Sequence, residues 1–171
     1  MPVIRDSYNN NVTFGKKSHK RNIGKRGYTK EEKALRYEIK VAAIRLGWKD
    51  VYTDRCFTKT NPPTVEHLIP HTLRKVCSMG EGFQINGLDN LFPAGAIGNV
   101  QRGDERFAVT VLKQPAILDR LLTELSKYGK FKSQLIDGKD WAERLTTTML
   151  RELEGIYSDL STRKISFIKN L

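Results

Sequence analysis

The chain has 171 residues, of which 39% are hydrophobic and 29% are charged, with 30 Lys and Arg against 19 Asp and Glu. This length and composition predict a globular domain with its own core and exclude a chain that is disordered throughout. No apolar run approaches the roughly 18–20 residues that a membrane-spanning helix needs, and the N-terminus lacks the apolar stretch of a signal peptide. The lack of such a run predicts no membrane partner, and the formal net charge of +11 favours a polyanionic one.

The positive charge is concentrated in the first third of the chain. Residues 1–50 carry 13 basic and five acidic side chains, whereas residues 51–104 carry five of each. Residues 1–27 contain glycines and an asparagine run that interrupt any periodicity, so we expect a flexible basic arm there. Such an arm can bind nucleic acid by neutralising its phosphates. The alternative interpretation is a solvated tail with no binding role. The arm residues expected to bind nucleic acid are Lys16, Lys17, Lys20, Arg21, Lys25 and Arg26.

A helix is predicted from Thr29 to Gly47. Thr29 and Glu32 have the spacing of a capping box, in which each side chain accepts a hydrogen bond from a backbone N–H group. Apolar residues then recur at the spacing of one helical face. They are Leu35, Ile39, Ala42 and Leu46.

Short elements are expected in the middle of the chain. A glycine-rich loop is predicted over residues 72–88, and a short helix over residues 95–102 that ends at Gly103. β-Branched and aromatic residues predict the strands. These cover residues 51–58, 64–69, 88–92 and 107–112.

Two longer helices are predicted in the last third. One begins at Pro115 and ends at Gly129, and the other extends from Lys139 to Leu160. Each has an apolar stripe that fits either an internal core or the seam of a homodimer, so the chain is expected to be a monomer or a homodimer.

The two cysteines, Cys56 and Cys77, belong to no Cys-x-x-Cys pair. A structural zinc ion on four Cys and His ligands is therefore not expected. Two isolated thiols are typical of a protein in a reducing cytoplasm.

Four residues of the neutral middle third have a spacing that indicates chemistry. Glu66 and His67 are adjacent at the end of a predicted strand, just before Leu68-Ile69-Pro70. Asn90 lies 23 residues after His67, and Asn99 lies nine residues after Asn90 and is followed by Arg102-Gly103. In combination this pattern resembles the HNH nuclease family, whose core is a ββα-metal fold. The resemblance covers residues 51–104.

The chain departs from the family pattern in its ligands. Many members bind zinc with Cys-x-x-Cys pairs beside the motif, whereas this chain has Gly95-Ala96-Ile97-Gly98 where one such pair often stands. Asn99 replaces the final His, so the resemblance is to an HNN variant, and Glu66 stands where Asp is common. We expect the packing of flanking helices to hold the motif in place of zinc.

The resemblance implies a role for each motif residue. His67 is expected to be the general base, and Asn90 to hold the His67 loop through its amide. Glu66 and Asn99 are expected to bind Mg²⁺ or Mn²⁺, which prefer oxygen ligands of this kind. Arg102, three residues after Asn99 on the same helical face, is expected to contact phosphate.

The fold and function expected from this resemblance are those of an endonuclease. The fold would be α+β, with a small ββα-metal core over residues 51–104 and a helical part over residues 115–160. Both belong to one domain of residues 28–171 that follows the basic N-terminal arm. The activity would be metal-dependent hydrolysis of DNA that leaves 5′-phosphate and 3′-hydroxyl ends. A homing, nicking or restriction enzyme in the cytoplasm of a bacterial or phage-infected cell would fit it.

Two alternatives remain at this stage. One is a non-catalytic DNA-binding protein on the same ββα frame, against which the presence of both Glu66 and His67 argues. The other is a structural RNA-binding protein, for which the chain has no known RNA-binding motif. For His71 the sequence leaves open a phosphate contact, assistance to the site and capping of the Pro70 turn.

Overall fold

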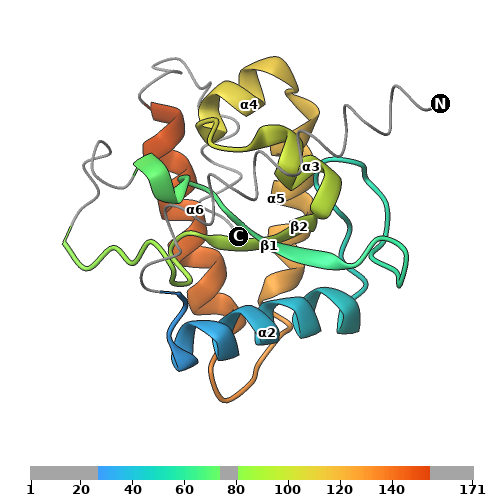
Figure 1. Cartoon of the computed structure of the whole chain (residues 1–171), viewed down its shortest axis with the longest axis vertical. Coiled ribbons are helices and arrows are strands. Elements are labelled where there is room, and N and C mark those ends of the chain that lie inside the picture. Colours follow the sequence, from blue (N-terminus) through green and yellow to red (C-terminus); the bar gives the residue numbers. More distant parts are fainter. Residues whose placement is uncertain (1–26, 74–80, 155–171) are drawn as a thin grey trace.

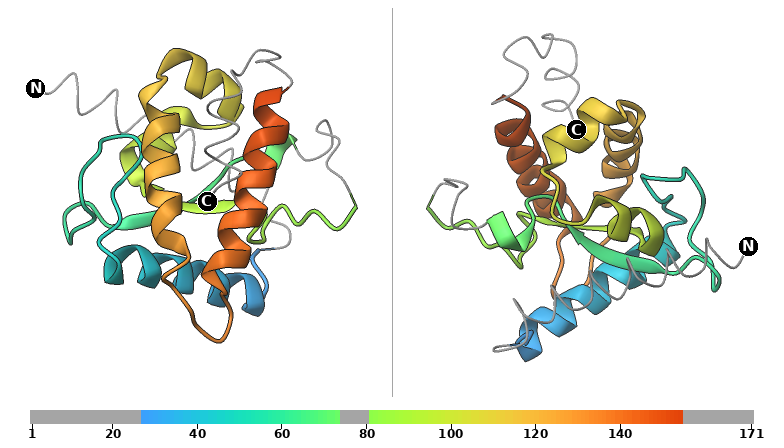
Figure 2. Two further views of the ribbon diagram at one scale, coloured as in Figure 1. Left: turned by 180° about the vertical axis from the view of Figure 1, so that it is seen from behind. Right: turned by 45° about the horizontal axis from the view of Figure 1, so that its top comes forward.

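The computed structural model describes residues 27–73 and 81–154, in which five α-helices accompany a two-stranded antiparallel sheet. The expected mixture of α and β elements is therefore confirmed for these residues. In Figure 1 the α2 helix (Lys30–Arg45) lies below the sheet and the α4 helix (Phe107–Lys113) lies above it. The left view of Figure 2, seen from behind, shows the α5 (Ala116–Tyr128) and α6 (Gly138–Glu154) helices in front of the sheet.

The first described helix, α2, spans Lys30–Arg45 and begins as the sequence predicts. The Glu32 N–H group donates to the Thr29 hydroxyl at 3.1 Å, and the Thr29 N–H group donates to the Glu32 carboxylate at 2.9 Å. The helix ends at its C-cap Leu46, after which Gly47 adopts a φ of 60° that glycine accommodates without strain.

The sheet is a hairpin of β1 (Pro63–His67) and β2 (Leu91–Gly95), in which Pro63 pairs with Gly95 and His67 pairs with Leu91. The strand predicted over residues 64–69 is confirmed with shifted ends, and a short helix η1 (His71–Leu73) follows it. The strand predicted over residues 88–92 begins three residues later than expected. It passes through Pro93, which a two-stranded sheet tolerates because each strand has an unpaired edge.

The short helix α3 (Ala96–Arg102) follows β2 directly and ends at Gly103, as predicted. Helices α2 and α3 both contact the two strands of the hairpin. The hairpin and α3 thus occur in the order strand, strand, helix, and both strands are held between helices.

Two of the predicted strands are wrong. Residues 51–58 form turns with a single bridge between Lys49 and Cys56, and Asp54 adopts a positive φ of 57°. Residues 107–112 belong to helix α4 (Phe107–Lys113), which contacts α5 and α6. Burial of one face of this helix against those two helices outweighs the weak strand preference of its β-branched residues.

The last two described helices are α5 (Ala116–Tyr128) and α6 (Gly138–Glu154). Pro115 and Gly129 bound α5 as predicted, and α6 begins one residue before the predicted start. The end expected at Leu160 lies outside the described residues. None of the described helices is long and apolar enough to cross a membrane.

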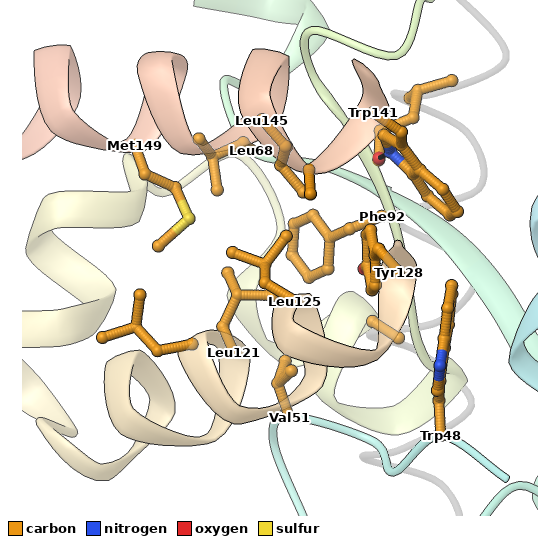
Figure 3. Packing of buried hydrophobic residues seen from close by; sticks show 14 of the residues in the cluster. Trp48, Val51, Leu68, Phe92, Leu121, Leu125, Tyr128, Trp141, Leu145 and Met149 are labelled. Carbon is orange, nitrogen blue, oxygen red and sulfur yellow. Dashed lines mark hydrogen bonds between the residues drawn. The ribbon is translucent and has the colours of Figure 1, made fainter. Parts of the chain in front are cut away.

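Side chains from α5, α6 and the segment after α2, together with residues of α2 and α4, form the apolar core (Figure 3). The Trp48 and Tyr128 rings stack with their centroids 4.1 Å apart, and the Tyr128 and Trp141 centroids are 4.2 Å apart. Phe92 of β2 and Leu68, which follows β1, are also fully buried in this cluster. The core therefore supports the hairpin directly.

Candidate functional site

Buried polar side chains gather around the end of β1. Glu66, His67, Asn90 and Arg102 are each at most 6% exposed. They come from β1, from the turn before β2 and from the last turn of α3. The order strand, strand, helix therefore brings together four of the residues that the sequence selects.

Asn90 fixes the backbone that follows His67. Its Oδ1 accepts a hydrogen bond from the Ile69 N–H group at 2.7 Å, and its Nδ2 donates to the Ile69 carbonyl at 2.9 Å and to the Ile85 carbonyl at 3.0 Å. Its own carbonyl accepts from the Leu68 N–H group at 2.8 Å. This geometry agrees with the expectation that the Asn90 amide holds the His67 loop.

The His67 ring faces the loop before β2 and helix α2. Its Nε2 lies 2.8 Å from Oδ1 of Asn86, whose Nδ2 donates to Glu32 at 3.0 Å. The ring also meets His71, with centroids 6.1 Å apart and planes at 74°. His71, whose role the sequence leaves open, therefore lies beside His67 in the short helix η1.

The Glu66 carboxylate lies among donors from the protein itself. Oε1 accepts from the His67 N–H group at 3.0 Å and pairs with Nη1 of Arg102 at 3.3 Å, and Oε2 accepts from the Tyr52 hydroxyl at 3.3 Å. Burial raises the pKa of the Glu66 carboxyl to about 7, although Arg102 opposes this shift. Burial and the nearby Glu66 also raise the pKa of Tyr52, which keeps its proton and donates it.

Arg102 lies inside the protein. Its side chain is 1% exposed, and its Nη atoms donate to the carbonyls of His67 and Leu68 at 2.6 and 2.5 Å. The phosphate contact expected from its spacing does not fit this position, because the guanidinium already binds the end of β1 and Glu66. The helical spacing of Arg102 was interpreted correctly, but the side chain points into the hairpin.

Asn99 is half-buried on α3. Its Nδ2 donates to the Thr64 hydroxyl at 3.1 Å, and that hydroxyl donates to the Ala94 carbonyl at 2.8 Å. Because Thr64 and Glu66 alternate with Val65 along β1, Asn99 lies on the side of the hairpin that carries Glu66. His67 points to the other side, toward Asn86.

Glu66 and Asn99, the two expected metal ligands, both bond to other groups of the protein in this arrangement. Both oxygens of Glu66 have donors from the protein, and one of these donors is the Arg102 cation. The described residues contain no group of three or more His, Cys, Asp or Glu side chains that could hold a metal ion. A divalent cation bound through Oε1 would therefore compete with Arg102, and one bound through Oε2 would compete with the Tyr52 hydroxyl.

Gly95 and Gly98 allow close packing between the start of α3 and the segment after α2. A Cβ atom at Gly98 would lie 2.2 Å from the Tyr52 ring, and one at Gly95 would lie 2.3 Å from the Asp50 carboxylate. That carboxylate accepts from the Gly95 N–H group at 2.9 Å and from the Thr53 hydroxyl at 2.8 Å. The segment after α2 thus packs against the start of α3, and this contact was not predicted.

Glu32, Tyr52 and Asn86 are neighbours of the site that were not predicted. Glu32 was interpreted only as a helix cap, and Asn86 only as part of a glycine-rich loop. Their contacts join residues 14 to 54 positions apart, and no local pattern indicates such pairs.

The basic side chains of the arm cannot be placed relative to this site. The six residues expected to bind nucleic acid, Lys16, Lys17, Lys20, Arg21, Lys25 and Arg26, lie outside the described residues. Cys77 also lies outside them, and Cys56 is an exposed free thiol.

Comparison with known proteins identified no relative of this chain. No family model matches the chain, and neither the curated proteins nor the solved structures gave a significant match.

Proposed function

We propose that this chain is an endonuclease of the HNH type that hydrolyses phosphodiester bonds of DNA. The observation that carries the proposal is the pairing of the Asn90 amide with both the N–H group and the carbonyl of Ile69. These bonds hold the backbone next to His67 at the end of β1, within a strand–strand–helix unit. These contacts support the proposal, because the motif pattern expects the Asn90 amide to hold the His67 loop.

In the proposed reaction, His67 takes a proton from a water molecule. Imidazole is the side chain best suited to accept a proton at neutral pH. The water oxygen then attacks phosphorus and the bond to the 3′ oxygen breaks. That oxygen takes a proton from solvent, which leaves a 5′-phosphate and a 3′-hydroxyl. Since His67 is only 6% exposed, the neighbouring side chains must give way for a phosphate to reach the ring.

The net charge of +11 supports DNA as the substrate. Its concentration before residue 51 supplies the sequence-independent attraction to phosphates that a nuclease needs. We place the enzyme in the cytoplasm of a bacterial or phage-infected cell, on the resemblance of the motif alone.

Metal dependence is a separate part of the proposal. Mg²⁺ or Mn²⁺ is the expected cofactor, with Glu66 and Asn99 as its protein ligands. Because Arg102 occupies the Glu66 carboxylate in this arrangement, we derive no step of the reaction through the ion.

A second candidate function is DNA binding without cleavage, and the Glu66–Arg102 ion pair favours it. A carboxylate that is held by Arg102, Tyr52 and a backbone N–H group serves to fix the hairpin. In this second candidate function, the strand–strand–helix unit would bind DNA without cleaving it, and His67 would have a structural role.

Incubation of the purified full chain with supercoiled plasmid separates the two candidates. The enzyme hypothesis predicts nicked circles that DNA ligase reseals, since ligase needs a 5′-phosphate beside a 3′-hydroxyl. Retarded plasmid that is never nicked, in Mg²⁺ or in Mn²⁺, would establish binding alone. Nicking that stops with EDTA supports the metal ion, whereas nicking that continues in EDTA excludes it and retains the nuclease.

A further inference from the structure

A chain of hydrogen bonds leads from helix α2 to the ring of His67. The Thr29 N–H group donates to Oε2 of Glu32 at 2.9 Å, and Nδ2 of Asn86 donates to Oε1 of Glu32 at 3.0 Å. Oδ1 of Asn86 lies 2.8 Å from Nε2 of His67. Glu32 and Asn86 are both half-buried, and 54 residues separate them.

The direction of each bond in this chain follows from chemistry. An ionised carboxylate has no hydrogen to donate, so Glu32 accepts from both of its neighbours. An Asn86 amide turned end for end would place two oxygens against each other. The amide nitrogen therefore faces Glu32, and the amide oxygen faces His67. Because that oxygen can only accept, Nε2 of His67 must carry a hydrogen.

We propose that Glu32 and Asn86 are positioning residues that hold neutral His67 in the tautomer with its proton on Nε2. In that tautomer Nδ1 has the lone pair. The nitrogen that takes the proton in the proposed reaction is then Nδ1. The assignment of the tautomer rests on the hydrogen bonds alone, whereas its effect on cleavage rests on the proposed function.

A single substitution reverses the chain of bonds. In Glu32→Gln, the Gln oxygen keeps the bond from the Thr29 N–H group, so the Gln amide group turns toward Asn86. Asn86 then presents its oxygen to the Gln and its nitrogen to His67. Nε2 of His67 must accept that bond, and the proton moves to Nδ1.

Glu31→Gln is the matched control. Glu31 lies beside Glu32 in the first turn of α2, and it is exposed. The control removes the same charge from the same helix end and leaves the contact with Asn86 unchanged. It therefore separates the orientation of the amide from the electrostatics of the helix terminus.

The test is ¹⁵N–¹H NMR of the ring nitrogens in the full chain, at a pH where all three histidines are neutral. The His67 signals are assigned by their loss in His67→Gln. We expect the Nε2–H form to dominate in the wild type and in Glu31→Gln, and the Nδ1–H form to dominate in Glu32→Gln. A wild-type ring in the Nδ1–H form, or a Glu32→Gln ring unchanged from wild type, would overturn the proposal.

Cleavage by the same variants links the tautomer to the reaction. Glu32→Gln should lower the single-turnover rate by about 10²-fold or more at unchanged DNA affinity, since the base presents the wrong nitrogen. Glu31→Gln should keep the wild-type rate. A tautomer that reverses with no change in rate excludes Nδ1 as the base. A wild type that never cleaves refutes the proposed function and leaves the tautomer result standing.

Discussion

The hairpin with α3 and the helix pair α5–α6 differ in what they bury. Around the hairpin, the side chains of Glu66, His67, Asn90 and Arg102 are enclosed with their hydrogen-bonding partners. Between α5 and α6 the enclosed side chains are mostly apolar. They include Leu118, Leu121, Leu125, Leu145 and Met149. Buried polar groups are costly unless their partners stay in place, whereas apolar groups need only to be covered.

The apolar region supplies the partners that the polar region needs. Nε1 of Trp141 in α6 donates to the Leu91 carbonyl at 2.9 Å, and the Thr148 hydroxyl donates to the Asp89 carbonyl at 2.5 Å. From α5, Arg120 donates to the Tyr52 carbonyl at 2.9 Å. The helices of the apolar region thus hold the backbone on both sides of Asn90.

The largest effect is expected at the buried ion pair. Arg102→Met leaves the Glu66 carboxylate without its cation, and breaking a buried pair typically costs about 3–5 kcal/mol. The cost should increase from pH 5 to pH 8, because Glu66 must lose its proton in a site that no longer balances the charge. Leu121→Ala should cost about 2–5 kcal/mol through a cavity, with no such pH dependence. Urea unfolding of both variants measures the contrast, and equal pH profiles would contradict it.

A second experiment isolates the proton on Glu66. The folded-state pKa of about 7 lies above the ordinary value of 4.5, so the folded chain holds the proton more tightly than the unfolded chain does. The resulting stability is complete below pH 4.5 and is lost as the pH rises through 7, by about 3 kcal/mol in total. Wild type should lose this stability relative to Glu66→Gln over that interval. Parallel unfolding profiles of the two proteins would show that Glu66 does not titrate there.

The sequence predicted the parts of this region that depend on local patterns. The capping box, the ends of α3 and the ends of α5 follow from residues within a few positions of one another. The order strand, strand, helix also follows from local patterns. The contacts of Arg102 and Asn86 depend on which side of a strand faces which helix. That is decided by packing between distant segments, and residues 51–58 and 107–112 were assigned wrongly for the same reason.

An intermediate effect is expected where the segment after α2 packs against α3. Gly98→Ala would place a Cβ atom 2.2 Å from the Tyr52 ring. Overpacking of this kind costs about 1–3 kcal/mol. Gly129→Ala is the matched control, since its Cβ atom would lie at an ordinary 3.7 Å from Lys139 and its φ is −58°. Thermal or urea unfolding should separate the two variants, and similar stabilities would remove the role given to Gly98.

The smallest effect is expected at the start of α2. Thr29→Ala removes the hydroxyl that accepts from the Glu32 N–H group and should cost about 1 kcal/mol. Thr147→Ala is a suitable control, because this exposed hydroxyl donates to the Glu143 carbonyl of its own helix. The control should be neutral in urea unfolding, and a loss as large as that of Thr29→Ala would argue against a capping effect.

The proposal that the polar region performs catalysis is tested most directly by His67→Ala. The measurement is the single-turnover rate of nicking of supercoiled plasmid, together with DNA affinity and the free energy of unfolding of the same samples. We predict a rate lower by about 10²–10⁴-fold, with DNA affinity and folding retained. A folded variant that nicks plasmid at the wild-type rate would remove His67 from the reaction and contradict this account.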